Sequence, residues 1–271
     1  MSVGEFSFLF SSFSASSDFS FYLVMLLLCH FIGDYYLQTN KMARIKENNI
    51  RNTIIHSILY AVPFIFFLLG LEFSGSLNLM TTGIVIGVVL LHAVIDLIKC
   101  VCEKKLNVKQ FENESDIKRT GYIADQILHL IVVVTASFLL SGSAVFEISS
   151  GAYMLLKCLL FIVIISKPVN ISFKKIFEKY QPTQKSNENL ESIDSISGAG
   201  AIIGTLERLV MGIFIGIGQF AALGLVVAAK SIARYDQISK NKLFAEYFLI
   251  GTLYSVLAVL VVYYIIFVVL A

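Results

Sequence analysis

The stretch His30-Phe-Ile-Gly-Asp34-Tyr-Tyr-Leu-Gln38 closes an apolar run and places a histidine four residues before an aspartate. Side chains four residues apart lie on the same face of an α-helix. His92 with Asp96 and Asp125 with His129 repeat this spacing, so three of the four histidines have an aspartate one helical turn away. The pattern predicts helices that carry paired polar groups inside otherwise apolar segments.

The composition indicates a membrane protein. Of the 271 residues 57% are hydrophobic and only 15% are charged, whereas soluble domains carry about 25% charged residues. Apolar runs recur at the length of about 17–25 residues that crosses the hydrocarbon core of a bilayer. We therefore predict an all-α, multi-spanning helical membrane protein with about seven transmembrane helices and the lipid bilayer as its surroundings. The formal charge of +2 gives no reason to expect a nucleic-acid partner.

The apolar runs divide the chain into four parts. Residues 18–140 form a four-helix membrane core that contains all the histidines, with helices expected over 18–33, 53–71, 79–100 and 121–140. Residues 152–169 form a fifth transmembrane helix. The polar residues 170–197 are interpreted as a flexible cytoplasmic linker after a short amphipathic piece. Residues 198–271 form a C-terminal membrane part with one or two spans and a basic interfacial stretch.

The glycine-rich run over 209–229 has two interpretations. A single continuous helix that packs through Gly212 and Gly216 against the first bundle is the expectation, because the run has the length of one crossing. The alternative is a re-entrant hairpin over 198–229, which would keep the basic stretch 230–242 on the side where the hairpin began. The side of the C-terminus depends on this choice.

The distribution of basic residues predicts the orientation. The segments that follow the first, third and fifth helices contain most of the Lys and Arg residues of the first part, whereas the loops at 72–78 and 141–151 contain none. Cytoplasmic loops are the ones enriched in Lys and Arg. We therefore expect the N-terminus outside and the ends of the first, third and fifth helices at the cytoplasmic face.

This orientation brings every histidine to one membrane layer near the cytoplasm, where ionisable groups are usually functional. We predict a divalent-metal site there, with either one or two ions. Imidazole and carboxylate ligands favour Zn or Mn. Its predicted ligands are His30, His56, His92, Asp96, Asp125 and His129. Asp34 and Gln38 are expected to orient the ligand side chains without binding the ion themselves. Asp34 or Asp125 is the candidate catalytic base. The alternatives are hydrogen bonds within each helix, or a proton or ion pathway.

A second polar set lies in the C-terminal part. It consists of Glu207, Arg208, Lys230, Arg234 and Glu246. Glu207 and Arg208 are adjacent and so point to different faces of a helix. Lys230 and Arg234 are one turn apart, which is typical of a basic patch at the membrane interface. Glu246 is a candidate partner for one of these bases.

The motif residues resemble a known family. The stretch at 30–38, together with His56-Ser57-x-x-Tyr60, His92-x₃-Asp96 and Asp125-Gln126-x-x-His129, is similar to bacterial domain-of-unknown-function family 3307 over about residues 23–130. The resemblance implies a multi-pass protein of the bacterial cytoplasmic (inner) membrane without an established activity. A more distant likeness connects these motifs with the predicted membrane-bound metal-dependent hydrolases.

Three function classes therefore compete. We favour a metal-dependent hydrolase of a lipid-linked or phosphate-bearing substrate, because the halves of the first four helices that lie away from the histidines have almost no ionisable groups. A transporter or channel for a metal ion or protons would need polar groups through both leaflets. A non-enzymatic membrane protein would use its His–Asp pairs only to hold helices together. The sequence leaves the oligomeric state open.

Overall fold

The structure is a computed structural model that describes residues 17–38, 50–106, 114–142, 148–182 and 198–270. Every regular element in these ranges is a helix, and seven of the helices are long and apolar enough to cross a membrane. The predicted all-α class is therefore confirmed. The chain forms two compact units, residues 1–163 with 266–271, and residues 164–265.

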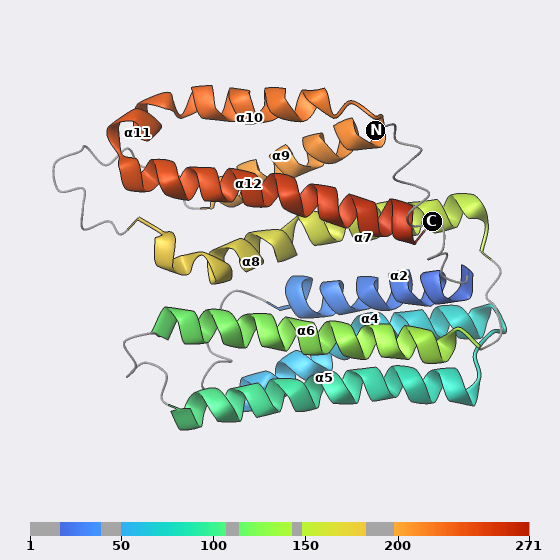
Figure 1. Ribbon diagram of the computed structural model, residues 1–271. Coiled ribbons are helices and arrows are strands. Elements are labelled where there is room, and N and C mark those ends of the chain that lie inside the picture. The colour runs from blue at the N-terminus through green and yellow to red at the C-terminus, as the bar shows by residue number, and fades with distance from the viewer. Residues whose placement is uncertain (1–16, 39–49, 107–113, 143–147, 183–197, 271) are drawn as a thin grey trace. The chain divides into compact units, whose positions relative to one another are not determined.

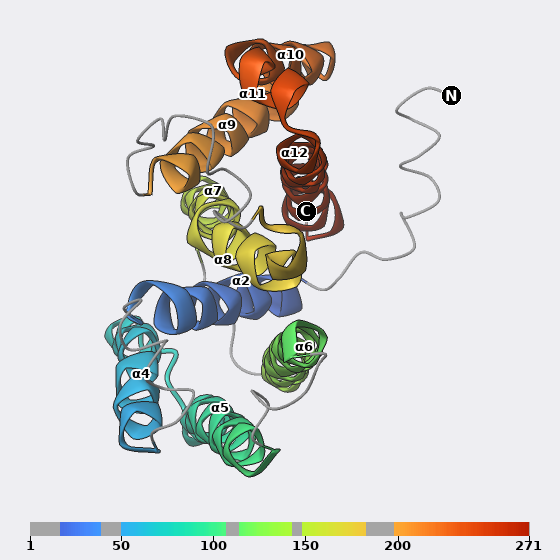
Figure 2. The same cartoon turned by 90° about the vertical axis from the view of Figure 1, so that its left-hand side faces the viewer.

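The first unit contains a bundle of four helices. Helix α2 (Ser17–Phe31) continues into the π-helical turn η1 (Ile32–Tyr36) and is followed by α4 (Ile50–Phe73), α5 (Leu79–Leu106) and α6 (Glu114–Leu140). Helix α5 packs between α4 and α6, and α2 closes the ring by packing against both α4 and α6. In Figures 1 and 2, α4, α5 and α6 run alongside one another while α2 crosses them obliquely.

The interior of this bundle contains a group of polar residues as well as an apolar core, and apolar residues cover its outside. On α4 the buried face begins with polar side chains and continues as an aromatic and aliphatic stripe, with Thr53, His56, Tyr60, Phe64, Phe67 and Leu71. Large apolar side chains of the same helix, such as Ile58 and Phe66, are exposed by 64% and 69%. Helices with exposed apolar faces of this extent need lipid around them. The protein is a multi-pass membrane protein.

The helices extend further than the apolar runs indicated. Helix α6 begins at Glu114 rather than at residue 121, since Glu114 and Asp116 in its first turn stabilise the N-terminal end of the helix dipole, and Glu114 pairs with Lys118. Helix α5 continues past Cys100 to Leu106, with Lys104 and Lys105 in its last turn. The charged ends of these helices are too polar for hydropathy to include them in the apolar runs.

A long helix is broken near the start of the second unit. Helix α7 (Ser150–Ile165) ends just before Ser166, and α8 (Lys167–Ile176) and the short η3 (Glu178–Tyr180) follow. Pro168 lies in the first turn of α8, where its missing N–H is tolerated. The predicted end of the fifth helix at residue 169 therefore falls inside α8. The predicted linker is described only to residue 182, and its remainder lies outside the described residues.

The predicted continuous helix over 209–229 is wrong. The chain instead forms α9 (Ala199–Gly216) and α10 (Ala221–Ala233), which pack against each other as a hairpin. Gly218 has φ +74°, and the N–H groups of Gly218 and Gln219 donate to the carbonyls of Ile215 and Phe214. This pair of bonds is a Schellman motif, which ends a helix at a glycine. The predicted packing through Gly212 and Gly216 against the first bundle stays a prediction.

The chain ends with α11 (Tyr235–Lys240) and α12 (Lys242–Tyr264), which continues into the π-helical turn η5 (Ile265–Val269). Asn241 caps α12 by accepting a hydrogen bond from the N–H of Phe244 at 3.0 Å. Within the second unit α12 packs against α9 and α8.

Candidate metal centre

The His/Asp constellation forms one buried cluster inside the four-helix bundle. His30 comes from α2, Asp34 from η1 and His56 from α4, while α5 supplies His92 and Asp96 and α6 supplies Asp125 and His129. All seven side chains are buried, the histidines almost completely, and Asp34 is the most exposed of them at 9%. The i, i+4 spacing on α5 and α6 directs each pair toward the bundle axis, as the sequence predicted.

One group of donor atoms has the dimensions of a metal site. His56 Nε2 lies 3.4 Å from His92 Nε2, 3.5 Å from Asp96 Oδ2 and 3.2 Å from Asp34 Oδ1. His92 Nε2 lies 3.4 Å from Asp96 Oδ2. In a tetrahedral zinc site with bonds of about 2.0–2.1 Å, neighbouring donor atoms are about 3.3 Å apart. The atoms of His56, His92 and Asp96 therefore have the spacing of three corners of such a site, and Asp34 Oδ1 lies beside that of His56.

A second group lies on the other side of Asp96. His129 Nε2 is 3.8 Å from Asp96 Oδ1 and 3.5 Å from Asp125 Oδ1. The same ring turns its Nδ1 toward His92 Nδ1, at 3.2 Å. Donor atoms of His92, Asp96 and His129 lie close enough together to hold an ion, as do those of Asp34, His56 and His92. His92 is common to both groups, and Asp96 presents one carboxylate oxygen to each side.

His30 belongs to the cluster but to neither group of donor atoms. Its Nδ1 makes a hydrogen bond of 3.1 Å with the hydroxyl of Tyr60, and its ring lies beside the rings of His92 and His129. Tyr60 in turn stacks on His92, with ring centroids 3.5 Å apart and planes inclined by 2°. Tyr60 thereby links His30 to the orientation of the His92 ring. Gln38, predicted as an orienting residue, follows η1 and is half-buried.

Sequence reasoning missed two polar residues that hold the carboxylates. Lys99 donates to Asp125 Oδ2 at 3.0 Å. Gln126 donates through its Nε2 to Asp34 Oδ2 at 3.2 Å and to Asp125 Oδ2 at 3.3 Å, while its Oε1 accepts from the Tyr35 hydroxyl at 2.9 Å. Lys99 lies one turn after Asp96, and Gln126 adjoins Asp125. Their positions next to the His/Asp motifs were therefore the signal in the sequence that could have identified these two residues.

The cluster is rich in negative charge. Metal ligation requires ionised carboxylates and neutral imidazoles. In that state Asp34, Asp96 and Asp125 contribute three negative charges, and Lys99 compensates one of them. Buried charges are costly unless they are paired. A divalent cation has the charge that would neutralise the remaining two carboxylates.

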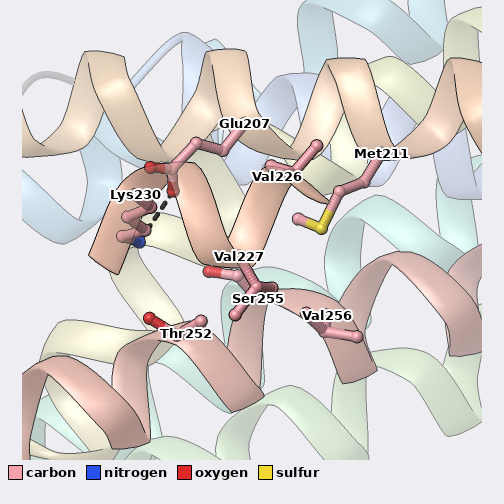
Figure 3. Close-up of a pocket in the computed structure, with 8 residues that line it drawn as sticks. All are labelled: Glu207, Met211, Val226, Val227, Lys230, Thr252, Ser255 and Val256. Carbon is pink, nitrogen blue, oxygen red and sulfur yellow. Dashed lines mark hydrogen bonds and ion pairs between the residues drawn. The ribbon is translucent and has the colours of Figure 1, made fainter. Parts of the chain in front are cut away.

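The second polar set is divided between different roles. Glu207 of α9 forms an ion pair of 2.7 Å with Lys230 of α10, beside a small pocket that also contains Thr252 and Ser255 of α12 (Figure 3). Arg208 points away from this pair and is buried, and it donates to the carbonyl of Ile165, the carbonyl of Ser166 and the side chain of Asn170.

The remaining two members of that set lie at the surface of the second unit. Arg234 contacts Gln237 at 3.4 Å and the ring of Phe244. Glu246 is exposed, and the described residues give it no ion pair. Its predicted pairing with a nearby base is thus not seen in the part of the chain that the structure describes.

Comparison with known proteins supplies a family for this fold and cluster. Residues 22–156 match the family model described as Protein of unknown function (DUF3307), and this part of the chain belongs to that family. The matched segment contains α4, α5 and α6 and every residue of the cluster. No curated protein and no solved structure matches the chain.

Proposed function

We propose that the protein is a membrane-embedded metal-dependent hydrolase whose divalent ion, Zn or Mn, is held by His56, His92 and Asp96. The observation that carries the proposal is the separation of their donor atoms, which lie 3.4–3.5 Å from one another. Two histidines and one carboxylate are a ligand set of catalytic zinc sites, which keep the fourth position for water or substrate.

Asp34 is the candidate general base. Its Oδ1 lies beside the donor group, 3.2 Å from His56 Nε2, and Gln126 donates to its other oxygen. Asp34 is also the most exposed carboxylate of the cluster. Asp125, the other predicted base, is bonded to Lys99 and faces His129 instead of the first donor group. Asp34 is therefore better placed beside an incoming water.

A divalent ion at this site would lower the pKa of bound water to about 7 and polarise the bond to be cleaved. The residues around it suit an anionic substrate, since Lys99 at the edge of the cluster carries a positive charge and its side chain is partly exposed, at 31%. A membrane-embedded position suits a substrate with a lipid tail. We therefore assign a lipid-linked or phosphate-bearing substrate.

The distribution of buried polar groups supports an enzyme over a transporter. Away from the cluster, the buried face of α4 continues as Phe64, Phe67 and Leu71, and that of α6 as Val133, Ala136, Ser137 and Leu140. None of these described residues is ionisable. An ion or proton pathway would need polar groups through this half of the bundle.

The orientation follows from the basic residues. Lys104 and Lys105 end α5, and Lys174 and Lys175 end α8. The positive-inside rule assigns such helix ends to the cytoplasm. We propose a bacterial cytoplasmic membrane, with the N-terminus outside and the cluster reached from the cytoplasmic leaflet.

The test is metal content together with turnover of a lipid-phosphate panel, both measured on purified protein. The wild type should carry a stoichiometric divalent ion. His56→Ala, His92→Ala and Asp96→Ala should each lose it, because each removes one of three ligands. Asp34→Asn should keep the ion and lose hydrolysis.

His30→Ala is the matched control. It removes a completely buried histidine of the same cluster whose ring nitrogens are outside both donor groups. It should reduce thermal stability and retain the ion. A wild-type protein that carries no ion, and that no added Zn or Mn stabilises, would contradict the metal site. Metal uptake into proteoliposomes without turnover would identify a transporter instead.

A further inference from the structure

His92 and His129, at the centre of the cluster, contact each other through their Nδ1 atoms. His92 Nδ1 lies 3.2 Å from His129 Nδ1, and both rings are buried, with exposures of 1% and 2%. A hydrogen bond between these atoms needs one N–H and one lone pair. A neutral imidazole carries a single N–H, so the bond fixes the tautomer of both rings at once.

This bond makes the two Nε2 atoms alternatives as metal ligands. If His92 binds an ion through Nε2, its proton is on Nδ1 and is donated to His129. His129 then carries its own proton on Nε2, where an N–H cannot ligate a cation. The reverse arrangement frees His129 Nε2 and places a proton on His92 Nε2. While the rings are neutral and this bond persists, only one of the two Nε2 atoms can bind an ion.

The surroundings of each Nε2 atom decide between the arrangements. His92 Nε2 faces another imidazole nitrogen, His56 Nε2, as well as Asp96 Oδ2, each at 3.4 Å. His129 Nε2 faces carboxylate oxygens, namely Asp125 Oδ1 at 3.5 Å and Asp96 Oδ1 at 3.8 Å. The surroundings of His92 Nε2, a second imidazole nitrogen and a carboxylate oxygen, favour a cation bound by all three atoms. The surroundings of His129 Nε2 are carboxylate oxygens, which favour an N–H on that nitrogen.

Two buried atoms support this assignment independently. Among the described residues, His129 Nε2 and Asp125 Oδ1 are both buried without a hydrogen-bond partner. They face each other at 3.5 Å. An N–H on His129 Nε2 would satisfy both atoms after a small approach, and buried polar groups rarely stay unsatisfied. Lys99 and Gln126 already hold the other oxygen of Asp125 at 3.0 Å and 3.3 Å.

We propose that His129 is a positioning residue and not a metal ligand: the chain Asp125–His129–His92 fixes the tautomer of His92 that binds the ion. The proposal rests on the proposed metal site and deepens it. It implies one ion per chain, held at the His56 side of Asp96. It reassigns His129 and Asp125 from ligands to the residues that orient a ligand, a role that raises metal affinity by about 10–100-fold.

Three substitutions at one position test the assignment. An asparagine side chain places its oxygen near the position of Nδ1, and a glutamine side chain near that of Nε2. His129→Ala should weaken Co²⁺ binding by about 10–100-fold. His129→Asn should recover most of that loss, because its oxygen accepts the N–H of His92, and should show the wild-type Co²⁺ absorption spectrum. His129→Gln should recover little.

The opposite pattern would overturn the proposal. Recovery by His129→Gln but not by His129→Asn would make Nε2 a ligand, as would two ions per wild-type chain. Loss in all three variants to the level of His56→Ala, or no loss in any, would also contradict it. A wild type that binds no Co²⁺ or Zn²⁺ would refute the metal site itself, and with it this inference.

Asp125→Asn keeps the test decisive if the His129 variants do not fold. The amide has one acceptor oxygen where the carboxylate has two, so His129 and the donors Lys99 and Gln126 no longer all have an acceptor. The variant should therefore weaken Co²⁺ binding by no more than about 10–100-fold and leave the absorption spectrum unchanged. A changed spectrum, or a loss equal to that of Asp96→Ala, would show that Asp125 is a ligand.

Discussion

The close contact between Gly33 and Tyr60 explains why the His30–Asp34 motif contains a glycine. A Cβ atom on Gly33 would lie 2.8 Å from the ring of Tyr60, 3.1 Å from its carbonyl oxygen and 3.2 Å from its Cα. The backbone of η1 therefore touches the backbone of α4 at this point. The contact places Asp34, the next residue, and Tyr60, which stacks on His92, in fixed positions around the cluster.

Replacing Gly33 by alanine should therefore loosen the cluster as well as the fold. The new methyl group meets backbone atoms of Tyr60, which cannot move as a side chain can, and overpacking of this kind costs about 1–3 kcal/mol. We expect a lower midpoint of thermal unfolding in detergent and weaker Co²⁺ binding, because the displaced η1 carries Asp34.

Gly83→Ala is the control for that variant. Gly83 is exposed on α5, and nothing lies within 4 Å of the added Cβ. Alanine there should leave the protein as stable or up to about 1 kcal/mol more stable, as is usual for glycine in a helix. Equal thermal midpoints for the two variants would show that the contact with Tyr60 is unimportant.

The sequence predicts which residues belong to the cluster, but it does not predict the contacts that they make between helices. The i, i+4 spacing identified His92 with Asp96 and Asp125 with His129, since a helix fixes which side chains share a face. Contacts between helices depend on their relative rotation, which spacing does not determine. Tyr60 stacked on His92 is such a contact, as are Lys99 with Asp125 and Gln126 with Asp34.

Among the elements, the break between α7 and α8 depends on one buried cation. Arg208 of α9 is 3% exposed and donates to the carbonyls of Ile165 and Ser166, where α7 ends. It also bonds to Asn170 of α8 at 2.7 Å and Ser255 of α12 at 3.4 Å. A cation at a helix C-terminus stabilises the helix dipole and the last carbonyls, which have no N–H partner within the helix. Arg208 of α9 thus connects the end of α7 with α8 and α12.

Arg208→Met should destabilise this unit. The substitution keeps an apolar stem and leaves a buried carbonyl without its donor, which costs about 1–3 kcal/mol for each such group. Thermal unfolding in detergent measures the loss. Arg234→Met should change stability by no more than about 0.5 kcal/mol, because Arg234 contacts Gln237 near the surface. If both variants unfold at the wild-type temperature, Arg208 has no such role.

The hairpin of α9 and α10 shows why element boundaries were harder to predict than element types. Both helices are apolar, so hydropathy alone gives one run over 209–229. The break depends on Gly218 in the left-handed region, followed by bonds from the N–H groups of Gly218 and Gln219. Several glycines in this run satisfy the same local requirement, and the sequence does not say which of them ends the helix.

At the scale of the whole molecule, the hairpin changes the expected topology. Helix α10 has 13 residues, about 20 Å at 1.5 Å per residue, which is too short to cross about 30 Å of hydrocarbon. Its Lys230 pairs with Glu207, in the first half of α9. The chain therefore returns toward the side from which α9 began, and the basic residues of α11 stay on that side.

Cysteine accessibility in intact cells and inverted vesicles tests this topology. Three reporters are placed in a chain whose native cysteines are replaced: Ser76→Cys between α4 and α5, Lys105→Cys at the end of α5, and Ser239→Cys in α11. Lys105 and Ser239 are exposed, and Ser76 lies in the turn after α4. We expect labelling of Ser76→Cys only from outside, and of the other two only from the cytoplasm.

The labelling results test different parts of the topology. Cytoplasmic labelling of Ser76→Cys would reverse the orientation inferred from the basic residues. Labelling of Ser239→Cys from outside would mean that the segment from α9 to α10 crosses the bilayer once despite its break at Gly218. If Ser239→Cys is cytoplasmic, α12 must cross from there, since it and η5 together span residues 242–269 without a break. The C-terminus would then lie outside, on the same side as the loop that contains Ser76.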